Sequence, residues 1–307
     1  MGDFLEDLDA RLLVDLLRDR ITPDRSLGQH FLLDESVISR SVQLPGEHGS
    51  PLGTDSHVLE VGPGPGSLTL AILRSGARVT ALEIDEDAVD HLNRVFPQND
   101  PNFNLINEDA LVAAWPEDTT HVIANIPYSI SSPLLERIQR HHSVNPFRSI
   151  VLLVQEEFAE RMSMRGGPAS AGPLGLSLWL DFEVLIDAKV PSSSFSPSPR
   201  VNSRLILLRP TERTGISPDF NRRLFRTITQ HCFANRRRKL RTLLSSTPRR
   251  ISRVKGWHKD RWKGASGEIL KSEIPELPED WANLRPENLE TKHWVILSDT
   301  FSTFNVE

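Results

Sequence analysis

Short apolar runs alternate with longer amphipathic stretches between about residues 55 and 209. The runs at 57–61, 78–82, 104–107 and 120–124 have the length and side chains of buried strands, and the stretches between them are compatible with helices. Such alternation predicts a mostly parallel sheet covered by helices. Because the carboxyl ends of parallel strands meet at one edge of a sheet, polar residues that follow these runs are expected to gather there.

The pattern outside this segment is helical. Leucines recur at helical spacing near the start of the chain, which predicts an amphipathic first helix that packs on the core or on a partner. The polar stretch from Arg209 to Pro218 predicts a linker, and the apolar positions beyond it predict a basic amphipathic helix and a helical tail. We therefore expect two domains, residues 1–210 and residues 211–307.

A glycine-rich turn, EVGPGPG at residues 60–66, lies between the first predicted strand and a predicted helix. Glycine lets the backbone bend sharply and lets a ligand approach closely, and a helix start presents unpaired N–H groups. A dinucleotide site prefers the spacing G-x-G-x-x-G, whereas this turn has G-x-G-x-G after an acidic residue, the form usual in class I methyltransferases. The turn indicates a cradle for S-adenosylmethionine, with Gly62, Gly64 and Gly66 at the cofactor; a tight structural turn is the alternative.

Two further predicted strands end in carboxylates. Glu83 follows the strand at 78–82, where it could accept hydrogen bonds from both hydroxyls of a ribose. Asp109 follows the strand at 104–107, where it could accept a hydrogen bond from the amine of an adenine. The acids at 85–87 are expected to open a helix instead, since negative charge suits the start of a helix dipole. Carboxylates at successive strand ends favour a ligand site over a purely structural turn.

The motif Asn125-Ile126-Pro127-Tyr128 follows the strand at 120–124 and predicts a clamp for an amine on a flat ring. An adenine amine is a poor nucleophile because its lone pair is delocalised into the ring, so an enzyme has to aim that lone pair at the methyl group. The side-chain oxygen of Asn125 and the backbone carbonyl of Ile126 can each accept one N–H. Pro127 restricts the backbone, and Tyr128 can stack on a base that has left its own stack. The alternative is a proline turn followed by a buried tyrosine.

Phe195 stands in a proline-rich segment, residues 194–203, and predicts a second aromatic platform. The prolines make a stiff, extended loop before the apolar run at 201–208. Such a loop could hold Phe195 against the opposite face of the base. A loop aromatic that caps the core is the alternative.

Four segments occur in an order that resembles the KsgA-type ribosomal RNA adenine dimethyltransferases, of the rRNA adenine N(6)-methyltransferase family. They are LGQHFL at 27–32, the glycine-rich turn, the motif from Asn125 to Tyr128 and the loop from Phe195 to Ser203. The resemblance covers nearly the whole chain, from about residue 20 to the end. It implies a Rossmann-like class I methyltransferase fold with a mostly parallel seven-stranded sheet, and a smaller α-helical C-terminal domain.

The same resemblance implies a set of contacts and a reaction. The residues that it places at S-adenosylmethionine are His30, Leu32, Gly62, Glu83, Asp109 and Asn125. Asn125 would also touch the target amine. The family transfers four methyl groups, two to each of two adjacent adenosines near the 3′ end of small-subunit ribosomal RNA. The expected partners are therefore small-subunit rRNA and the assembling small ribosomal subunit.

The chain departs from the family pattern at several positions. Members usually have Asn at the position of His30 and commonly have Lys at the position of Glu156. Tyr is common where Leu174 stands, and many members carry Asp at the position of Asn202. A side-chain contact from His30 or a charge role at Glu156 is therefore not implied. None of these changes touches Asn125, so catalysis is still expected.

The net charge of −5 and the pI near 6.1 do not suggest a nucleic-acid binder, but the distribution of charge does. Residues 220–263 contain 15 Lys or Arg and one acid, Asp260. A block this asymmetric, interleaved with aromatic residues, predicts contacts with phosphate. The residues expected at RNA are Arg236, Arg237, Arg238, Lys239 and Arg241. A solvated helix face is the alternative, although such faces usually mix both signs.

The remaining composition predicts a soluble, cytoplasmic protein. The single cysteine, Cys232, excludes an internal disulfide, fits a reducing compartment and is expected to be a small buried residue. The chain has no apolar run of about 18 residues, and its acidic start is unlike a signal or transit peptide, so no membrane partner is expected. The ten histidines lack metal-ligand spacing, so no metal site is expected.

The hypothesis from sequence is an S-adenosylmethionine-dependent enzyme that dimethylates adenosines of small-subunit (16S-type) rRNA during ribosome biogenesis. An Erm-type methyltransferase of 23S rRNA shares the motif at 125–128, but the basic segment from Phe233 to Leu244 is similar to that of the KsgA-type C-terminal domain and argues against it. A ribosome-assembly factor that binds RNA with little catalytic role is the alternative from another class. Binding of the cofactor distinguishes this last case.

Overall fold

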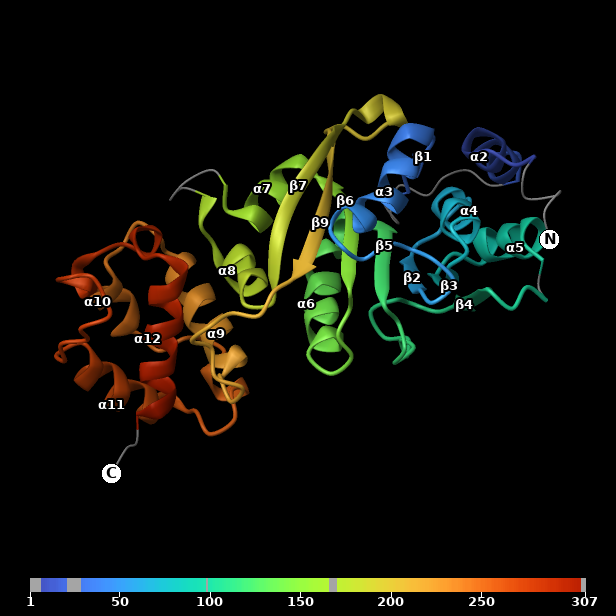
Figure 1. The fold of residues 1–307 in the computed structure, drawn as a ribbon. Helices are drawn as coiled ribbons and strands as arrows, with labels where there is room; N and C mark the ends of the chain where they lie inside the picture. The colour runs from blue at the N-terminus through green and yellow to red at the C-terminus, as the bar shows by residue number, and fades with distance from the viewer. Residues whose placement is uncertain (1–6, 21–28, 98, 166–169, 305–307) are drawn as a thin grey trace. The chain divides into compact units, whose positions relative to one another are not determined.

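The computed structural model describes residues 7–20, 29–97, 99–165 and 170–304 (Figure 1). The chain forms two compact units. The first comprises Met1–Ala159 and Glu183–Pro210, and the second comprises Glu160–Phe182 and Thr211–Glu307. The predicted division at residue 210 treats each domain as one continuous stretch, whereas Glu160–Phe182 packs with the later residues.

The first unit is built on a seven-stranded sheet with the order β4-β3-β2-β5-β6-β9-β7. Neighbouring strands from β4 to β6 run parallel, and β9 runs antiparallel to β6. The strands are β2 (His57–Val61), β3 (Arg78–Glu83), β4 (Phe103–Asn107), β5 (His121–Asn125), β6 (Ser149–Gln155), β7 (Phe182–Val190) and β9 (Ser203–Pro210). This sheet confirms the predicted mostly parallel, seven-stranded fold. Because β9 continues to Pro210, the expected linker can begin only after that residue.

The central strands are buried along their whole length, as their continuous apolar runs predict. Every residue of β2 is buried, and so are five of the six residues of β3. Val58, Val79 and Val122 are each 0% exposed. A strand that is covered on both faces has no solvent side, so its apolar residues do not alternate with polar ones.

Helices cover this sheet: α2 (Ala10–Arg18), α3 (Glu35–Glu47), α4 (Ser67–Arg74), α5 (Glu86–Val95), α6 (Ser131–His142) and the start of α7 (Glu156–Ser163). The amphipathic first helix is α2, which packs against α4 and α5 (Figure 1). Its Leu13 and Leu17 are fully buried, whereas Leu12 and Leu16 remain 41% and 38% exposed. Asp9 caps the helix by accepting a hydrogen bond from Leu12 N.

A two-stranded ribbon joins two segments that are far apart in the sequence. β1 (Phe31–Leu32) pairs antiparallel with β8 (Phe195–Ser196), with Phe31 opposite Ser196 and Leu32 opposite Phe195. Leu33 N also donates to Ser194 O over 2.9 Å. The ribbon therefore places the GQHFL segment beside the proline-rich loop.

The second unit is helical. Its helices are α8 (Pro173–Trp179), α9 (Arg222–Phe233), α10 (Leu240–Leu244), α11 (Lys259–Ile269) and α12 (Thr291–Thr303). α12 contacts both α9 and α11 (Figure 1). The rings of Trp262 and Phe301 stack in the core with their centres 4.6 Å apart. Cys232 is buried there, as expected. The predicted basic helix is interrupted at residues 234–239. The four successive residues 236–239 are all cations, which would repel one another along a helix.

Among the described residues, no helix has both the length and the apolar character that crossing a membrane requires.

Candidate active site

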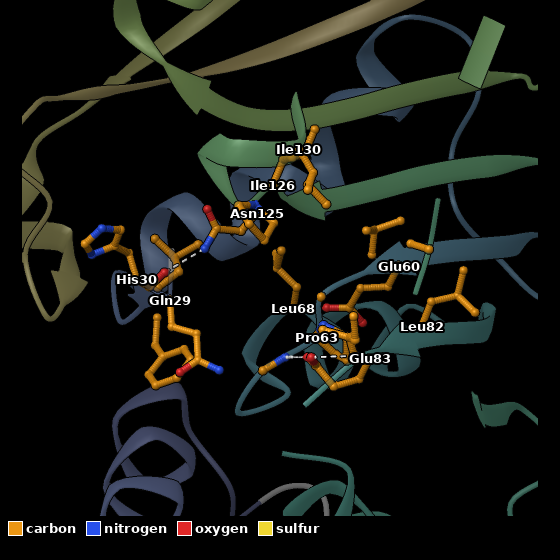
Figure 2. A pocket seen from close by; sticks show the side chains of 18 of the residues that line it. Gln29, His30, Glu60, Pro63, Leu68, Leu82, Glu83, Asn125, Ile126 and Ile130 are labelled. Atoms are coloured by element: carbon orange, nitrogen blue, oxygen red, sulfur yellow. Dashed lines mark hydrogen bonds between the residues drawn. The ribbon is translucent and has the colours of Figure 1, made fainter. Parts of the chain in front are cut away.

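A cavity of about 200 Å³ opens at the carboxyl ends of β2, β3 and β5 (Figure 2). Its lining combines four segments that the sequence analysis singled out. They are the residues from Gln29 to Leu32, the glycine-rich turn, the ends of the second and third predicted strands, and the motif from Asn125 to Tyr128. The structure therefore brings together at one edge of the sheet the strand-end groups that the parallel order predicts.

The glycine-rich turn depends on glycine at defined positions. Gly62, Gly64 and Gly66 all have positive φ, at 68°, 54° and 90°. At Gly66, the cap residue of α4, a Cβ would also lie 2.5 Å from the buried ring of Phe96. Gly66 does not line the cavity itself, unlike the other two glycines. Its role in this structure is to let the chain turn into α4 against α5.

Glu83 joins the turn to the end of β3. One of its carboxylate oxygens accepts a hydrogen bond from Gly64 N over 3.0 Å, and the other accepts from Ile84 N and Asp85 N over 2.9 and 3.0 Å. The side chain is 6% exposed, and this burial raises its pKa, while the three backbone N–H groups oppose the rise. Glu83 thus lies at the cavity wall with an orientation fixed by the backbone on both sides.

Asp85 behaves as the sequence predicted for a helix-start acid. It is the N-cap of α5 and accepts from Asp87 N over 3.0 Å. Its other oxygen accepts a hydrogen bond from Gln29 Nε2 over 2.6 Å. This bond connects the first cavity segment to α5, and Gln29 is a lining residue that the sequence analysis did not select.

Glu60 is the acid before the glycine-rich turn, and it is only 1% exposed. Its carboxyl group accepts a hydrogen bond from the hydroxyl of Thr69 on α4 over 2.6 Å. Burial, aided by the charge of Glu83, raises the pKa of Glu60 to about 8. Burial therefore favours the protonated form of Glu60, in which this carboxyl group carries no charge.

Asp109 lies in the loop after β4 and lines the cavity. Its Oδ1 accepts a hydrogen bond from Leu111 N over 2.8 Å. Its backbone carbonyl accepts from Val112 N and Ala113 N, both over 2.9 Å. No described residue donates a hydrogen bond to Oδ2, which is the acceptor that the sequence predicts for an adenine amine.

The chemistry of the lining fits S-adenosylmethionine. Glu83 and Asp109 offer acceptors at two successive strand ends, and the turn leaves room for close approach of a ligand to the backbone. The hydroxyl of Ser67 is buried at the cavity with no hydrogen-bond partner among the described residues. A buried orphan hydroxyl is a group that a polar ligand would satisfy. Ser67 was missed in the sequence analysis because a serine at a helix start is too common to be a signal.

Asn125 ends β5 with its amide held by the backbone of the first cavity segment. Its Nδ2 donates to the carbonyl oxygen of His30 over 2.8 Å (Figure 2). Because a carbonyl can only accept a hydrogen bond, the amide atom that faces His30 O has to be the nitrogen, Nδ2, and not the oxygen, Oδ1. Oδ1 of Asn125 is therefore presented as an acceptor, as the predicted clamp requires.

Tyr128 and His30 form the wall beyond Asn125. The Tyr128 hydroxyl lies 3.0 Å from the hydroxyl of Ser203, and burial raises the pKa of Tyr128. The ring centres of His30 and Tyr128 are 5.7 Å apart. Nδ1 of His30 bonds to the carbonyl of Pro197 over 2.7 Å, so the His30 ring is directed to the proline-rich loop. His30 reaches the clamp through its backbone carbonyl, which any residue at this position would provide.

Phe195 is not brought to the cavity. Its side chain is 3% exposed and belongs to the apolar core that also contains Leu32 and Leu205. It is absent from the cavity lining, whereas Leu32, its partner in the ribbon, is present. This placement differs from the expected second platform and agrees with the alternative of a loop aromatic that caps the core. A serine-proline loop can turn either way, so the sequence pattern did not decide between them.

The departures from the family pattern have local partners. Glu156 forms ion pairs with Arg204 and Lys189 at 2.6 and 3.5 Å, and the Arg204 guanidinium lowers the pKa of Glu156. Oδ1 of Asn202 accepts a hydrogen bond from Ser192 N over 3.3 Å. These contacts hold the end of β6 and the proline-rich loop, and they do not involve the cavity.

The predicted RNA-binding cations divide into two groups. Arg236 pairs with Glu287 at 2.8 Å, and Lys239 donates to Asn283 over 3.4 Å. Arg237, Arg238 and Arg241 are exposed, and no described residue pairs with them. The second group is the part of the basic segment that is free to meet phosphate.

The seven-stranded order, the glycine-rich turn after β2 and the strand-end carboxylates define a class I methyltransferase. Two solved structures share the fold. A dimethyladenosine transferase from Plasmodium falciparum superposes with a TM-score of 0.68 at 23% identity and covers 89% of this chain and 98% of its own. The 23S rRNA methyltransferase ErmE superposes with a TM-score of 0.56 at 24% identity, over 89% of this chain and 100% of its own.

Sequence comparison identifies the family. The pattern described as ribosomal RNA adenine dimethylase matches residues 22–256. Ribosomal RNA small subunit methyltransferase A of Prochlorococcus marinus (strain NATL2A) is 33% identical over 294 residues, which cover 92% of this chain and 96% of that protein. The protein of the same name from Lactobacillus helveticus (strain DPC 4571) is 31% identical, over 80% of this chain and 87% of its own.

The chain belongs to the ribosomal RNA adenine dimethylase family. The predicted family, enzyme class and methyl donor, S-adenosylmethionine, are thereby confirmed.

Proposed function

We propose that this protein transfers methyl groups from S-adenosylmethionine to the exocyclic amines of two adjacent adenosines near the 3′ end of small-subunit rRNA. The observation that carries the proposal is the orientation of Asn125, whose Nδ2 is bound by His30 O and whose Oδ1 is thereby presented as an acceptor. Relatives named for the small ribosomal subunit match over almost their full length, which supports this RNA as the substrate.

The residues of the cavity would divide the work between cofactor and base. Glu83 would accept hydrogen bonds from the ribose hydroxyls, and Asp109 would accept one from the adenine amine of the cofactor. Gly62 and Gly64 would lie against the ligand, and Leu32 would provide an apolar contact. When bound there, S-adenosylmethionine supplies an electrophilic methyl group on a positively charged sulfur.

At the target side, two acceptors would orient the amine of the flipped adenine. Oδ1 of Asn125 and the carbonyl of Ile126 would each take one N–H, which directs the nitrogen lone pair away from both. Tyr128 would stack on one face of the base, and Pro127 keeps the carbonyl of Ile126 in place. After transfer, the methylated nitrogen carries a positive charge and is strongly acidic, so it can lose its proton to water.

The helical second unit would contribute RNA affinity. Arg237, Arg238 and Arg241 are exposed and have no ion-pair partner among the described residues, so each can contact a phosphate without first breaking such a pair. Arg236 instead forms an ion pair with Glu287, and Lys239 donates a hydrogen bond to Asn283. We infer that the assembling small subunit, in the cytoplasm, is where this surface meets its RNA.

An assay of labelled methyl transfer tests the proposal. Purified protein and radiolabelled S-adenosylmethionine are mixed with under-methylated small or large ribosomal subunits, and the labelled nucleotides are mapped by nuclease digestion and mass spectrometry. Dimethyladenosine near the 3′ end of the small-subunit RNA is the expected product. Label in large-subunit RNA alone would replace the proposal with an Erm-type activity, and binding without label would replace it with an assembly factor.

A further inference from the structure

Arg137 lies where α6 meets the loop that follows Asp109. Its Nη1 donates a hydrogen bond to the carbonyl of Leu111, and its Nη2 donates to the carbonyl of Ala113. The guanidinium carbon also lies 4.7 Å from the centre of the Trp115 ring. One partly buried side chain from a different element thus contacts this loop at three residues.

Several other polar groups of this loop form hydrogen bonds within the loop itself. Oδ1 and the backbone carbonyl of Asp109 accept from the three N–H groups at 111–113. Trp115, which is 7% exposed, donates its Nε1–H to the carbonyl of Ala110 over 3.1 Å. The carbonyls at 111 and 113 are bonded from outside, by Arg137. Loss of that guanidinium would leave two carbonyls without their donor and the Trp115 ring without its cation.

The guanidinium and the cavity carboxylate also interact through space. Burial lowers the pKa of Arg137, whereas the charge of Asp109 opposes that decrease. The guanidinium of Arg137 and the carboxylate of Asp109 therefore attract one another. Geometry and charge act in the same direction, toward a fixed acceptor at Asp109.

α6 gives this contact a rigid base. The helix begins at Ser131, directly after the short turn Tyr128–Ile130, and Arg137 stands in its middle. Leu134, Leu135 and Ile138 of the same helix are buried in the core. The helix that follows the target-base motif thus also carries the side chain that contacts the loop after Asp109.

We propose that Arg137 is a positioning residue that holds Asp109 against the adenine of the cofactor and thereby sets the preference for adenine at this site. The inference rests on the proposed function, since it assumes that the nucleoside of S-adenosylmethionine occupies the cavity. Arg137 does not line the cavity, so its effect has to pass through the 109–115 loop.

Calorimetric binding of the product S-adenosylhomocysteine and of its inosyl analogue to the full chain tests this role without turnover. S-adenosylhomocysteine carries the amine that Asp109 would bind, and S-inosylhomocysteine carries a carbonyl oxygen in its place. Wild-type protein is expected to prefer the adenosyl compound by about tenfold or more, the size of one charge-assisted hydrogen bond. Arg137→Met is expected to weaken the adenosyl compound about tenfold and the inosyl compound much less, so that the preference falls.

Two further variants separate this role from general stability. Arg140→Met removes an exposed guanidinium from the same helix and should leave both dissociation constants unchanged. Arg137→Lys keeps the charge with a single donor group and should retain part of the preference. Circular dichroism and melting temperature identify which variants are folded.

Three outcomes overturn the inference. The first is a folded Arg137→Met protein that keeps the wild-type preference for the adenosyl compound. The second is an equal loss of affinity for both compounds, which would mean a purely structural role. The third is a folded Arg137→Lys protein with the full wild-type preference. If wild-type protein binds neither analogue, the proposed function itself fails. That result is distinct from binding that is insensitive to residue 137.

Discussion

Nδ2 of Asn125 donates a hydrogen bond to the backbone carbonyl of His30 over 2.8 Å, and this bond leaves Oδ1 as the acceptor at the cavity. The relationship joins the fourth parallel strand to a segment that lies 95 residues earlier in the chain. It uses only the backbone of His30, so the unusual side chain at that position is compatible with an intact clamp. The His30 ring is instead bonded to the carbonyl of Pro197.

Replacement of Asn125 by Ala removes this acceptor and should lower kcat for RNA methylation by about a hundredfold or more. The dissociation constant of S-adenosylhomocysteine should change by less than about threefold, because the ribose and adenine acceptors remain. Methyl transfer measured at saturating cofactor, together with calorimetry, separates the two effects. Asn107→Ala, which removes an amide on β4 that donates to Glu83 O on the neighbouring strand β3, is the matched control. Full activity of Asn125→Ala would contradict the assignment.

Phe195 offers a test of core packing against base stacking. Its ring is buried, so Phe195→Ala should destabilise the fold by about 3–5 kcal/mol. Phe195→Leu keeps most of the apolar volume and should cost less than about 1.5 kcal/mol, with kcat close to that of wild type. Denaturant unfolding and the methylation assay measure the two quantities. A large loss of kcat in a stable Phe195→Leu protein would instead show that the ring leaves the core to stack on the base.

Glu60 makes stability depend on pH. Its pKa is raised to about 8 in the folded protein, from an ordinary value of 4.5. The folded state therefore binds the extra proton, so the contribution is complete below pH 4.5 and is lost as the pH rises through 8. Glu60→Gln cannot ionise and can still accept from Thr69.

The melting temperature of Glu60→Gln relative to wild type should therefore increase between about pH 5 and pH 8 and level off above that range. Differential scanning calorimetry across this range measures the difference. Glu157→Gln changes an exposed glutamate on α7 and is the matched control for the loss of a carboxylate. A constant difference for Glu60→Gln would show that the group is already ionised in the folded state.

The two groups of cations predict opposite phenotypes. Ala at Arg237, Arg238 or Arg241 should weaken RNA binding and reduce the slope of log K against log salt by about 0.7–0.9 each, without a change in stability. Arg236→Ala should destabilise the fold by about 1 kcal/mol or less, because its ion pair with Glu287 is partly exposed. Binding titrations at several salt concentrations measure these slopes, and denaturant unfolding measures the stability of each variant. Identical slopes for wild type and the Arg237 variant would remove that residue from the RNA surface.

The sequence predicts best the features that depend on local pattern. Gly64 and Glu83 could be placed because a turn and a strand end recur in fixed register with the sheet. The burial of Phe195 could not be predicted, since it follows from its pairing with Leu32, far away in the chain. Arg137 also escaped notice, because a cation in the middle of an amphipathic helix has no local pattern that distinguishes a contact from a solvated charge. The grouping of Glu160–Phe182 with the later residues is likewise a long-range result of packing.

The ribbon between Phe31 and Ser196 has a consequence for the order in which the protein is made. The glycine-rich turn, Glu83 and Asp109 have all been synthesised by residue 109, whereas Pro197, which holds the His30 ring, is added much later. A chain that is still leaving the ribosome therefore contains the elements of its cofactor half before it can complete its target half. The part of the cavity that would bind the target base is complete only when β8, which is synthesised late, pairs with β1, which is synthesised early.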